Sequence, residues 1–179
     1  MINLVTSCSW DSVEFFIFSK NVFDPLIYYS HLGPLLASLV LFVFIFLANR
    51  QEFLNKLLLI LIALFCTWSF LDLVLWADDK PQHIMFVWST LIIFETAIYG
   101  VAFYFVYYFI HNKDLSLIYK MPILLLYLPV LFFLGTHYNL EYFDFTNCER
   151  EAAEGKLWVY EYVVEIIFVI LILSQLALS

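Results

Sequence analysis

Residues 90–110, TLIIFETAIYGVAFYFVYYFI, form an almost unbroken run of apolar and aromatic side chains that contains one carboxylate, Glu95. An α-helix of about 20 residues crosses the hydrocarbon core of a bilayer, which is about 30 Å thick. The run is too long and too continuously apolar for a strand of a membrane barrel, whose side chains alternate in polarity. In lipid, backbone polar groups must also bond within the protein. The stretch therefore predicts a membrane-spanning helix with an ionisable group inside it.

The composition of the whole chain indicates a membrane protein. Hydrophobic residues make up 64% of the 179 residues and charged residues 13%, whereas soluble domains are about half apolar and a quarter charged. Such a chain cannot cover a water-facing surface, so the lipid bilayer is its expected surrounding. The formal net charge of −8 argues against a nucleic-acid partner, because phosphate binding requires basic patches.

Five segments are apolar enough and long enough to span a bilayer, at residues 29–49, 54–76, 84–110, 119–136 and 157–178. We therefore predict an all-α fold, a polytopic transmembrane helix bundle of five spans over residues 29–179. A polar N-terminal segment, residues 1–28, precedes the bundle. This segment lacks the basic start and the apolar centre of a signal peptide.

The short connections predict the orientation of the bundle. The connections after the first and third spans hold Arg50, Lys56, Lys113 and Lys120. Basic residues concentrated in short loops lie on the cytoplasmic side. We therefore expect the N-terminus outside and Ser179 inside.

Two of the three cysteines fall on the predicted outer side, where disulfides persist. Cys8 lies in the N-terminal segment and Cys148 in the longest loop. A Cys8–Cys148 disulfide would tie the N-terminal segment over the outer mouth of the bundle. The alternative is two free thiols in separate segments.

Acidic residues within the spans are the candidate functional groups. A charge at the bilayer centre costs at least about 2.5–3.5 kcal/mol, so such residues usually face the bundle interior or a wet cavity. Glu161 and Glu165 are four residues apart and share a helix face, and aromatic residues share the faces of the other acids. We predict an outward-opening, acidic, aromatic-lined pocket between the second, third and fifth spans. Its candidate ligand-binding residues are Glu95, Asp72, Glu165, Glu161, Tyr99, Trp68 and Trp88.

A structural role for the same residues stays open. A protonated Glu95 could hydrogen-bond a neighbouring helix and hold the two together. Asp72 and Glu161 could reach the interface with their head groups, and the tryptophans could form the usual interfacial belt. His31, His83 and His137 fall at the outer boundary on three different segments, where ordinary interfacial histidines are expected.

Signatures of catalysis are absent from the sequence. There is no Walker A loop, GxSxG, HExxH or CxxC motif. We therefore predict no catalytic residues, no metal, no cofactor and no enzymatic activity in this chain.

Three stretches carry a resemblance to a known family. LIYYSHLGPLLASLVLFVFIFLANR (26–50) resembles the first span of the N-terminal seven-transmembrane sensor region of bacterial sensor histidine kinases. NRQEFLNKLLLILIALFCTWSFLDLVLW (49–76) is similar to its short basic turn and second span, and YNLEYFDFTNCEREAAEGKLWVYEYVVEIIF (138–168) to its outer loop and fifth span. The chain departs from the family in having five spans rather than seven, which indicates a truncated protein.

The resemblance implies a function in two-component signalling, in the inner (plasma) membrane of a bacterium. A sensory module of this kind would detect an extracytoplasmic or intramembrane cue, either an unknown small ligand or a proton. It would relay the cue to a cytoplasmic kinase domain that this chain lacks, in a protein that forms a homodimer. The alternatives are a fragment of a cation- or proton-coupled transporter or channel, and a structural membrane subunit. The inner half of every predicted span is free of acids, which counts against the transporter.

Overall fold

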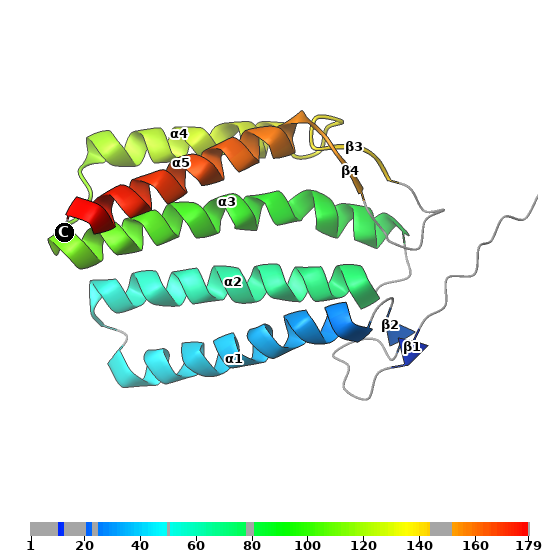
Figure 1. Cartoon of the computed structure of the whole chain (residues 1–179), viewed down its shortest axis with the longest axis horizontal. Coiled ribbons are helices and arrows are strands. Elements are labelled where there is room, and N and C mark those ends of the chain that lie inside the picture. The colour runs from blue at the N-terminus through cyan, green and yellow to red at the C-terminus, as the bar shows by residue number, and fades with distance from the viewer. Residues whose placement is uncertain are drawn as a thin grey trace, which may run out of the picture.

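The described part of the chain forms a bundle of five α-helices with two small antiparallel strand pairs at one end (Figure 1). The computed structural model describes residues 11–12, 21–22, 25–49, 51–77, 81–143 and 152–178. The helices are α1 Pro25–Asn49, α2 Phe53–Ala77, α3 Pro81–His111, α4 Leu117–Phe133 and α5 Lys156–Leu178. The strands are β1 Asp11–Ser12, β2 Asn21–Val22, β3 Leu140–Phe143 and β4 Ala152–Glu154. Each helix coincides with one predicted span, so the prediction of an all-α helical bundle is confirmed.

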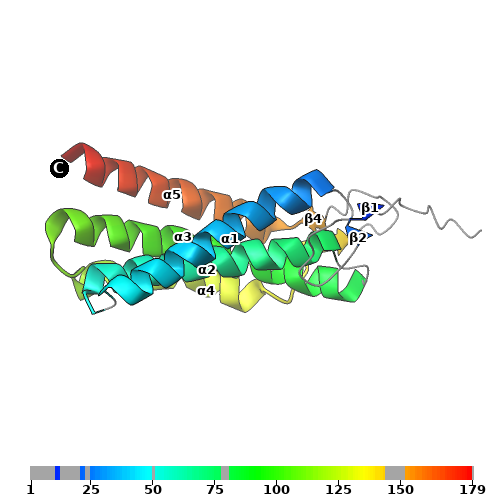
Figure 2. The same cartoon turned by 90° about the horizontal axis from the view of Figure 1, so that it is seen from below.

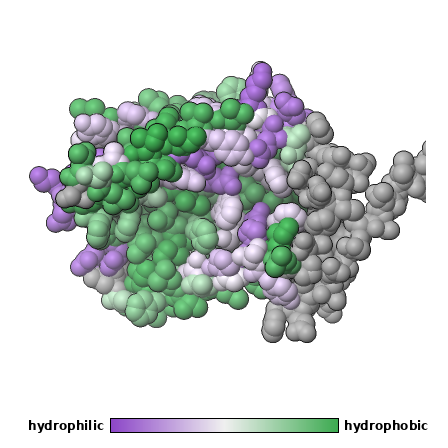
Figure 3. All heavy atoms as spheres, viewed as in Figure 1, coloured by the Kyte–Doolittle hydropathy of each residue, from purple (hydrophilic) through white to green (hydrophobic). Residues whose placement is uncertain are grey.

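Four helices of the described chain are long and apolar enough to cross a membrane, namely α1, α2, α3 and α5. α4 has 17 residues and is therefore about 25 Å long, shorter than a hydrocarbon core of about 30 Å. The structure thus supports a multi-pass membrane protein. Apolar side chains cover much of the face that Figure 3 shows, and large exposed ones on α1 and α5 include Val40, Phe44, Ile170 and Leu173.

Consecutive helices run antiparallel, so the bundle has two distinct ends (Figure 1). We call the end that carries the four strands and the first turns of α1, α3 and α5 the strand end. The opposite end, here the connection end, carries residues 51–52 and 112–116 and the last turn of α5. Asn112 leaves α3 there with a φ of 48°, a left-handed conformation that asparagine tolerates better than most residues.

Buried apolar residues gather in three clusters between the helices. α2 packs on α1 through a cluster that includes Ile62 and Leu73 of α2 and Tyr28 of α1. Figure 2 shows α1 crossing α2 obliquely. At the strand end, α2, α3 and α5 share a second cluster that includes Ile92 and Trp158. The third cluster lies toward the connection end and joins α3 to α5; its buried members are Phe103, Leu115, Val164 and Phe168.

The β3–β4 hairpin is fastened to the start of α5 and to α3. The pairing is antiparallel with an irregularity between Leu140 and Tyr142. The backbone N–H of Gly155 donates to the Asn139 carbonyl at 2.7 Å, and the buried Asn139 amide donates to the Ser89 carbonyl of α3 at 2.9 Å. A Cβ on Gly155 would collide with the backbone of Tyr138, so only glycine fits there.

The cysteine predictions divide between described and undescribed positions. Cys66 lies buried in α2 as a free thiol. Cys8 and Cys148 lie outside the described residues, so the predicted disulfide stays a prediction.

Candidate functional site

Three of the four predicted intramembrane acids come together between α3 and α5, in the half of the bundle nearer the strand end. We call Glu95, Glu161 and Glu165 the acid cluster. Glu95 projects from α3 and the other two from successive turns of α5. The charges of Glu165 and Glu95 both act on Glu161 through space. The predicted convergence of acids from separate helices is therefore present for these three residues.

Glu161 is the most unusual member of the cluster. Its exposed fraction is 0%, and neither carboxyl oxygen has a hydrogen-bond partner among the described residues. A buried polar group without a partner costs free energy, and a buried charge without one costs far more. Such groups in native proteins are therefore candidates for a functional role.

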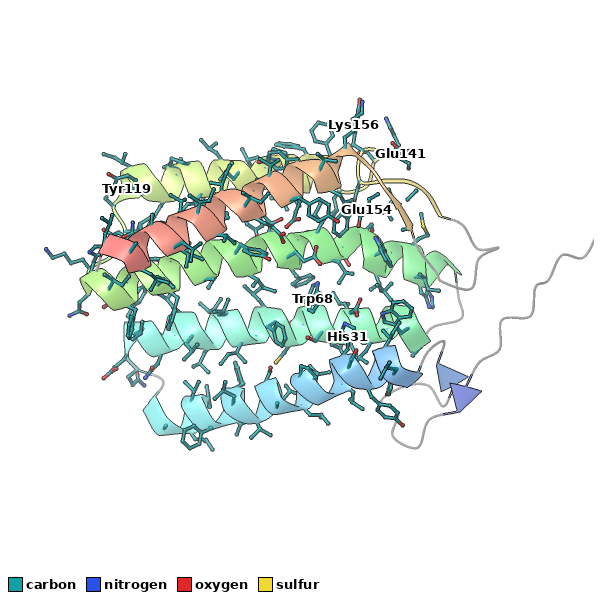
Figure 4. All side chains as sticks on the ribbon, in the orientation of Figure 1. His31, Trp68, Tyr119, Glu141, Glu154 and Lys156 are labelled. Atoms are coloured by element: carbon teal, nitrogen blue, oxygen red, sulfur yellow. The ribbon has the colours of Figure 1, made fainter. Side chains whose placement is uncertain are left out.

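Tyr99 and Trp68 complete the surroundings of the acid cluster. The charges of Glu165, Glu161 and Glu95 all act on Tyr99, one turn along α3 from Glu95. The indole N–H of Trp68, on α2, donates to Glu95 Oε1 at 2.8 Å. Figure 4 shows Trp68 reaching from α2 toward α3. This bond joins α2 to α3.

Asp72, one turn along α2 from Trp68, pairs with α1. Its carboxylate Oδ2 lies 2.8 Å from His31 Nε2 and accepts a bond of 3.3 Å from the Trp76 indole N–H. The second ring nitrogen of His31, Nδ1, lies 2.9 Å from the Ile27 carbonyl oxygen. Both ring nitrogens thus face acceptors, an arrangement that a doubly protonated imidazolium satisfies.

The two polar groups are adjacent but distinct. The His31 and Trp68 rings have centroids 6.2 Å apart, and the charge of Asp72 acts on Glu95. A chain of polar side chains therefore runs from α1 through α2 and α3 to α5. The sequence predicted Asp72 in the same pocket as the other acids, whereas the structure gives it a partner of its own on α1.

His31 was expected to be an ordinary interfacial histidine, and its pairing with Asp72 is the functional contact that sequence reasoning missed. A usable signal existed, since His31 and Asp72 both lie about one turn from the outer ends of their predicted spans. Trp88, another predicted site residue, packs beside the strand-end apolar cluster. Its indole N–H is buried without an acceptor among the described residues.

The three cavities described below lie away from the acid cluster. Three cavities bounded by described residues have volumes of about 430, 400 and 340 Å³. The first lies between α3 and α4, the second near Ser89 and Gly135, and the third near Glu52 and Asn112. None of these three has a member of the acid cluster in its wall, so the outward-opening acidic pocket stays a prediction. Within the described ranges, no three His, Cys, Asp or Glu side chains form a metal-binding group.

The connection end has a smaller polar group of its own. Lys120 Nζ donates to Asp114 Oδ2 at 2.8 Å, and the Tyr104 hydroxyl donates to Asp114 Oδ1. These two hydrogen bonds hold the pKa of the Asp114 carboxyl below its usual range. His111 Nε2 lies 2.8 Å from Gln175 Oε1, which links the last turn of α3 to the last turns of α5.

Comparison with models of protein families, with curated proteins and with solved structures finds no match. The functional assignment of this chain therefore rests on its own site, an enclosed carboxyl group at the α3–α5 interface that has no hydrogen-bond partner in the described part of the chain.

Proposed function

We propose that the chain is a membrane-embedded sensory module. A small cationic ligand or a proton arrives at the acid cluster and changes the packing of α5 against α3. The helices carry this change to the connection end. The observation that supports the proposal is the complete enclosure of Glu161 without a hydrogen-bond partner among the described residues.

Glu161 lacks a hydrogen-bond partner among the described residues, and this lack costs free energy. A missing partner for a buried polar group costs about 1–3 kcal/mol, and more for a charged group. A proton or a cationic donor that reaches Glu161 removes part of this cost. The two packings of α3 and α5 then differ in their affinity for the cue, which is the condition for a ligand to shift a conformational equilibrium.

An apolar layer separates the acid cluster from the connection end. Phe168 follows Glu165 on α5, about one turn along, and is 0% exposed. Phe103 of α3 packs against Phe168, with ring centroids 6.1 Å apart. A layer of this kind stops ions or protons along the α3–α5 interface, which favours a sensor over a transporter.

α5 is well suited to relay a movement. It is one continuous helix of 23 residues with neither glycine nor proline, and sharp helix kinks usually occur at such residues. From Glu161 to Gln175 the helix rises about 21 Å. Gln175 contacts His111 of α3 at the far end, so a tilt or slide of α5 changes this contact.

The topology of this module follows from the arrangement of the helices. α3 ends at the connection end and α5 begins at the strand end (Figure 1), so the chain between them returns through the length of the bundle as α4. We therefore infer a fifth membrane crossing, with the connection end and its lysines Lys56, Lys113 and Lys120 in the cytoplasm. In a bacterial inner membrane this orientation points α5 toward a cytoplasmic output, such as a kinase domain in a longer protein.

Binding to the acid cluster tests the proposal. A ligand that binds only the folded state raises its stability by RT ln(1 + [L]/Kd), about 2.7 kcal/mol at one hundred times Kd. We would measure unfolding of the purified chain in detergent across pH and with monovalent, divalent and primary-ammonium cations. One cue should stabilise the wild type and have no effect on Glu161→Gln.

The matched control is Glu141→Gln, which removes an exposed acid at the same end of the bundle and should respond like the wild type. An equal response of Glu161→Gln would show that the cue binds elsewhere. Cue-dependent flux of ions or protons across the membrane of proteoliposomes would show that the chain is a transporter and not a sensor.

A further inference from the structure

The largest of the three cavities is a groove between α3 and α4, and no part of the proposed signalling route uses it. Its volume is about 430 Å³, with Ala97, Gly100 and Val101 on the α3 wall and Ile123 and Leu124 on the α4 wall. Leu124 is 60% exposed, so the groove opens onto the outer surface of the bundle.

The polar atoms at the edge of the groove are already engaged. The Tyr127 hydroxyl donates to the Ile93 carbonyl at 2.9 Å, and the Tyr104 hydroxyl donates to Asp114. The remaining wall is hydrocarbon. A polar ligand would therefore lose its hydration in the groove without gaining hydrogen bonds, whereas an apolar chain would gain dispersion contacts along it.

One end of the groove carries a charge. Lys120 lines the groove and holds its ammonium 5.3 Å from the centre of the Tyr104 ring. An ammonium has three N–H donors, and the bond to Asp114 uses one. Residues 113–120 hold two lysines, Lys113 and Lys120, and one aspartate, Asp114, and therefore carry one net positive charge. This charge lies toward the connection end, because Tyr104 is only about 10 Å from the last residue of α3.

The packing of α4 leaves room for an occupant. Val130 is the residue of α4 that is buried, and the hydroxyl of Tyr160 on α5 holds the helix through the Leu126 carbonyl at 2.8 Å. An occupant of the groove would complete the incomplete interface between α3 and α4. A single hydrocarbon chain with an anionic head at the membrane surface matches both the apolar wall and the cationic end.

We propose that the α3–α4 groove binds a membrane phospholipid, with one acyl chain along Gly100 and Ile123 and its phosphate on Lys120. The site is independent of the acid cluster. Its lipid fills the interface and fixes the position of α4 against α3.

Native mass spectrometry of the full chain, released from detergent after addition of defined lipids, measures the binding. The probes are phosphatidylglycerol, phosphatidylcholine and diacylglycerol with identical acyl chains. Both phospholipids should be retained and diacylglycerol should bind more weakly. Equal retention of diacylglycerol would overturn the phosphate contact.

Substitutions test each half of the site against matched controls. Gly100→Leu fills the groove and should abolish the retained lipid, while Gly33→Leu, at a position with nothing within 4 Å of an added Cβ, should not. Lys120→Gln should weaken retention of phospholipid about three- to fivefold, as expected for a partly exposed ion pair. Lys56→Gln, an exposed lysine at the same end, should have no effect. If Gly33→Leu loses as much retained lipid as Gly100→Leu, the lipid is ordinary annular lipid. If Gly100→Leu dissociates a dimer of the chain, the occupant of the groove is a second copy. Either result overturns the proposal.

A measurement on the wild-type chain avoids any folding defect in these variants. A phospholipid with a photoreactive group on its acyl chain should crosslink to the groove face of α4, at Ile123 and Leu124. Crosslinks spread evenly over exposed apolar residues of α1 and α5 would contradict a specific site.

Discussion

Replacing Glu161 by methionine should stabilise the folded chain, although it removes the central residue of the proposed site. The carboxyl is fully enclosed and both oxygens lack a hydrogen-bond partner among the described residues. Methionine is unbranched, has a similar length and contains no group that needs a hydrogen bond. Removing one unsatisfied buried polar group recovers about 1–3 kcal/mol.

The assay is reversible unfolding of the purified chain in mixed micelles at increasing denaturing detergent. The wild type and Glu161→Met are compared with Glu141→Met, an exposed acid whose replacement should change the free energy of unfolding by no more than about 0.5 kcal/mol. Glu161→Met should raise the free energy of unfolding by about 1–3 kcal/mol and lose the response to the cue. A loss of more than about 1 kcal/mol would mean that the carboxyl has a stabilising partner, and the reasoning would fail.

Four further predictions concern contacts outside Glu161. Trp68→Phe removes the bond to Glu95 and should cost about 0.5–1.5 kcal/mol in the same assay, the net contribution of one hydrogen bond. Trp76→Phe should lose less because its bond to Asp72 is longer, and equal losses would contradict this ranking. A double-mutant cycle of His31→Ala and Asp72→Asn should show a coupling above about 0.5 kcal/mol, and additive effects would disprove the pair. Gly155→Ala should destabilise the β3–β4 hairpin because its Cβ meets the Tyr138 backbone, whereas Gly33→Ala should be tolerated; circular dichroism melting compares them. The pKa of the Asp114 carboxyl is lower in the folded state than its ordinary value of 3.8. The ionised carboxyl therefore stabilises the folded chain above pH 3.8, and this stabilisation is lost as the pH falls through the lowered pKa. A pH titration of unfolding should show this loss in the wild type and not in Asp114→Asn.

The helices were the most predictable part of the structure, because membrane spans are recognised by length and hydropathy alone. The predicted span 54–76 became Phe53–Ala77, and 84–110 became Pro81–His111. Errors occurred at the helix ends. α1 begins at Pro25, four residues earlier than predicted, since proline is favoured in the first helical turn.

The site was predictable in composition but not in its pairing. The spacing of Glu161 and Glu165 places both on one face of a helix, and their approach to Glu95 required only that acids avoid lipid. The pairing of Asp72 with His31 depends on the rotation of α1 about its own axis, which hydropathy does not specify. The β3–β4 hairpin was also unpredicted, because its short strands are held by tertiary bonds from Asn139 rather than by a periodic pattern.

The most direct test of the account is the distance between the connection ends of α3 and α5, measured by spin labels on Phe109→Cys and Leu173→Cys in lipid nanodiscs. These are exposed positions on α3 and α5, in a background without the native cysteines whose stability matches the wild type. The cue that stabilises the chain should shift the distance distribution in the wild-type background and leave it unchanged in Glu161→Gln. A distribution that stays fixed while the cue binds would contradict a sensory role, and the same shift in Glu161→Gln would remove Glu161 from its mechanism.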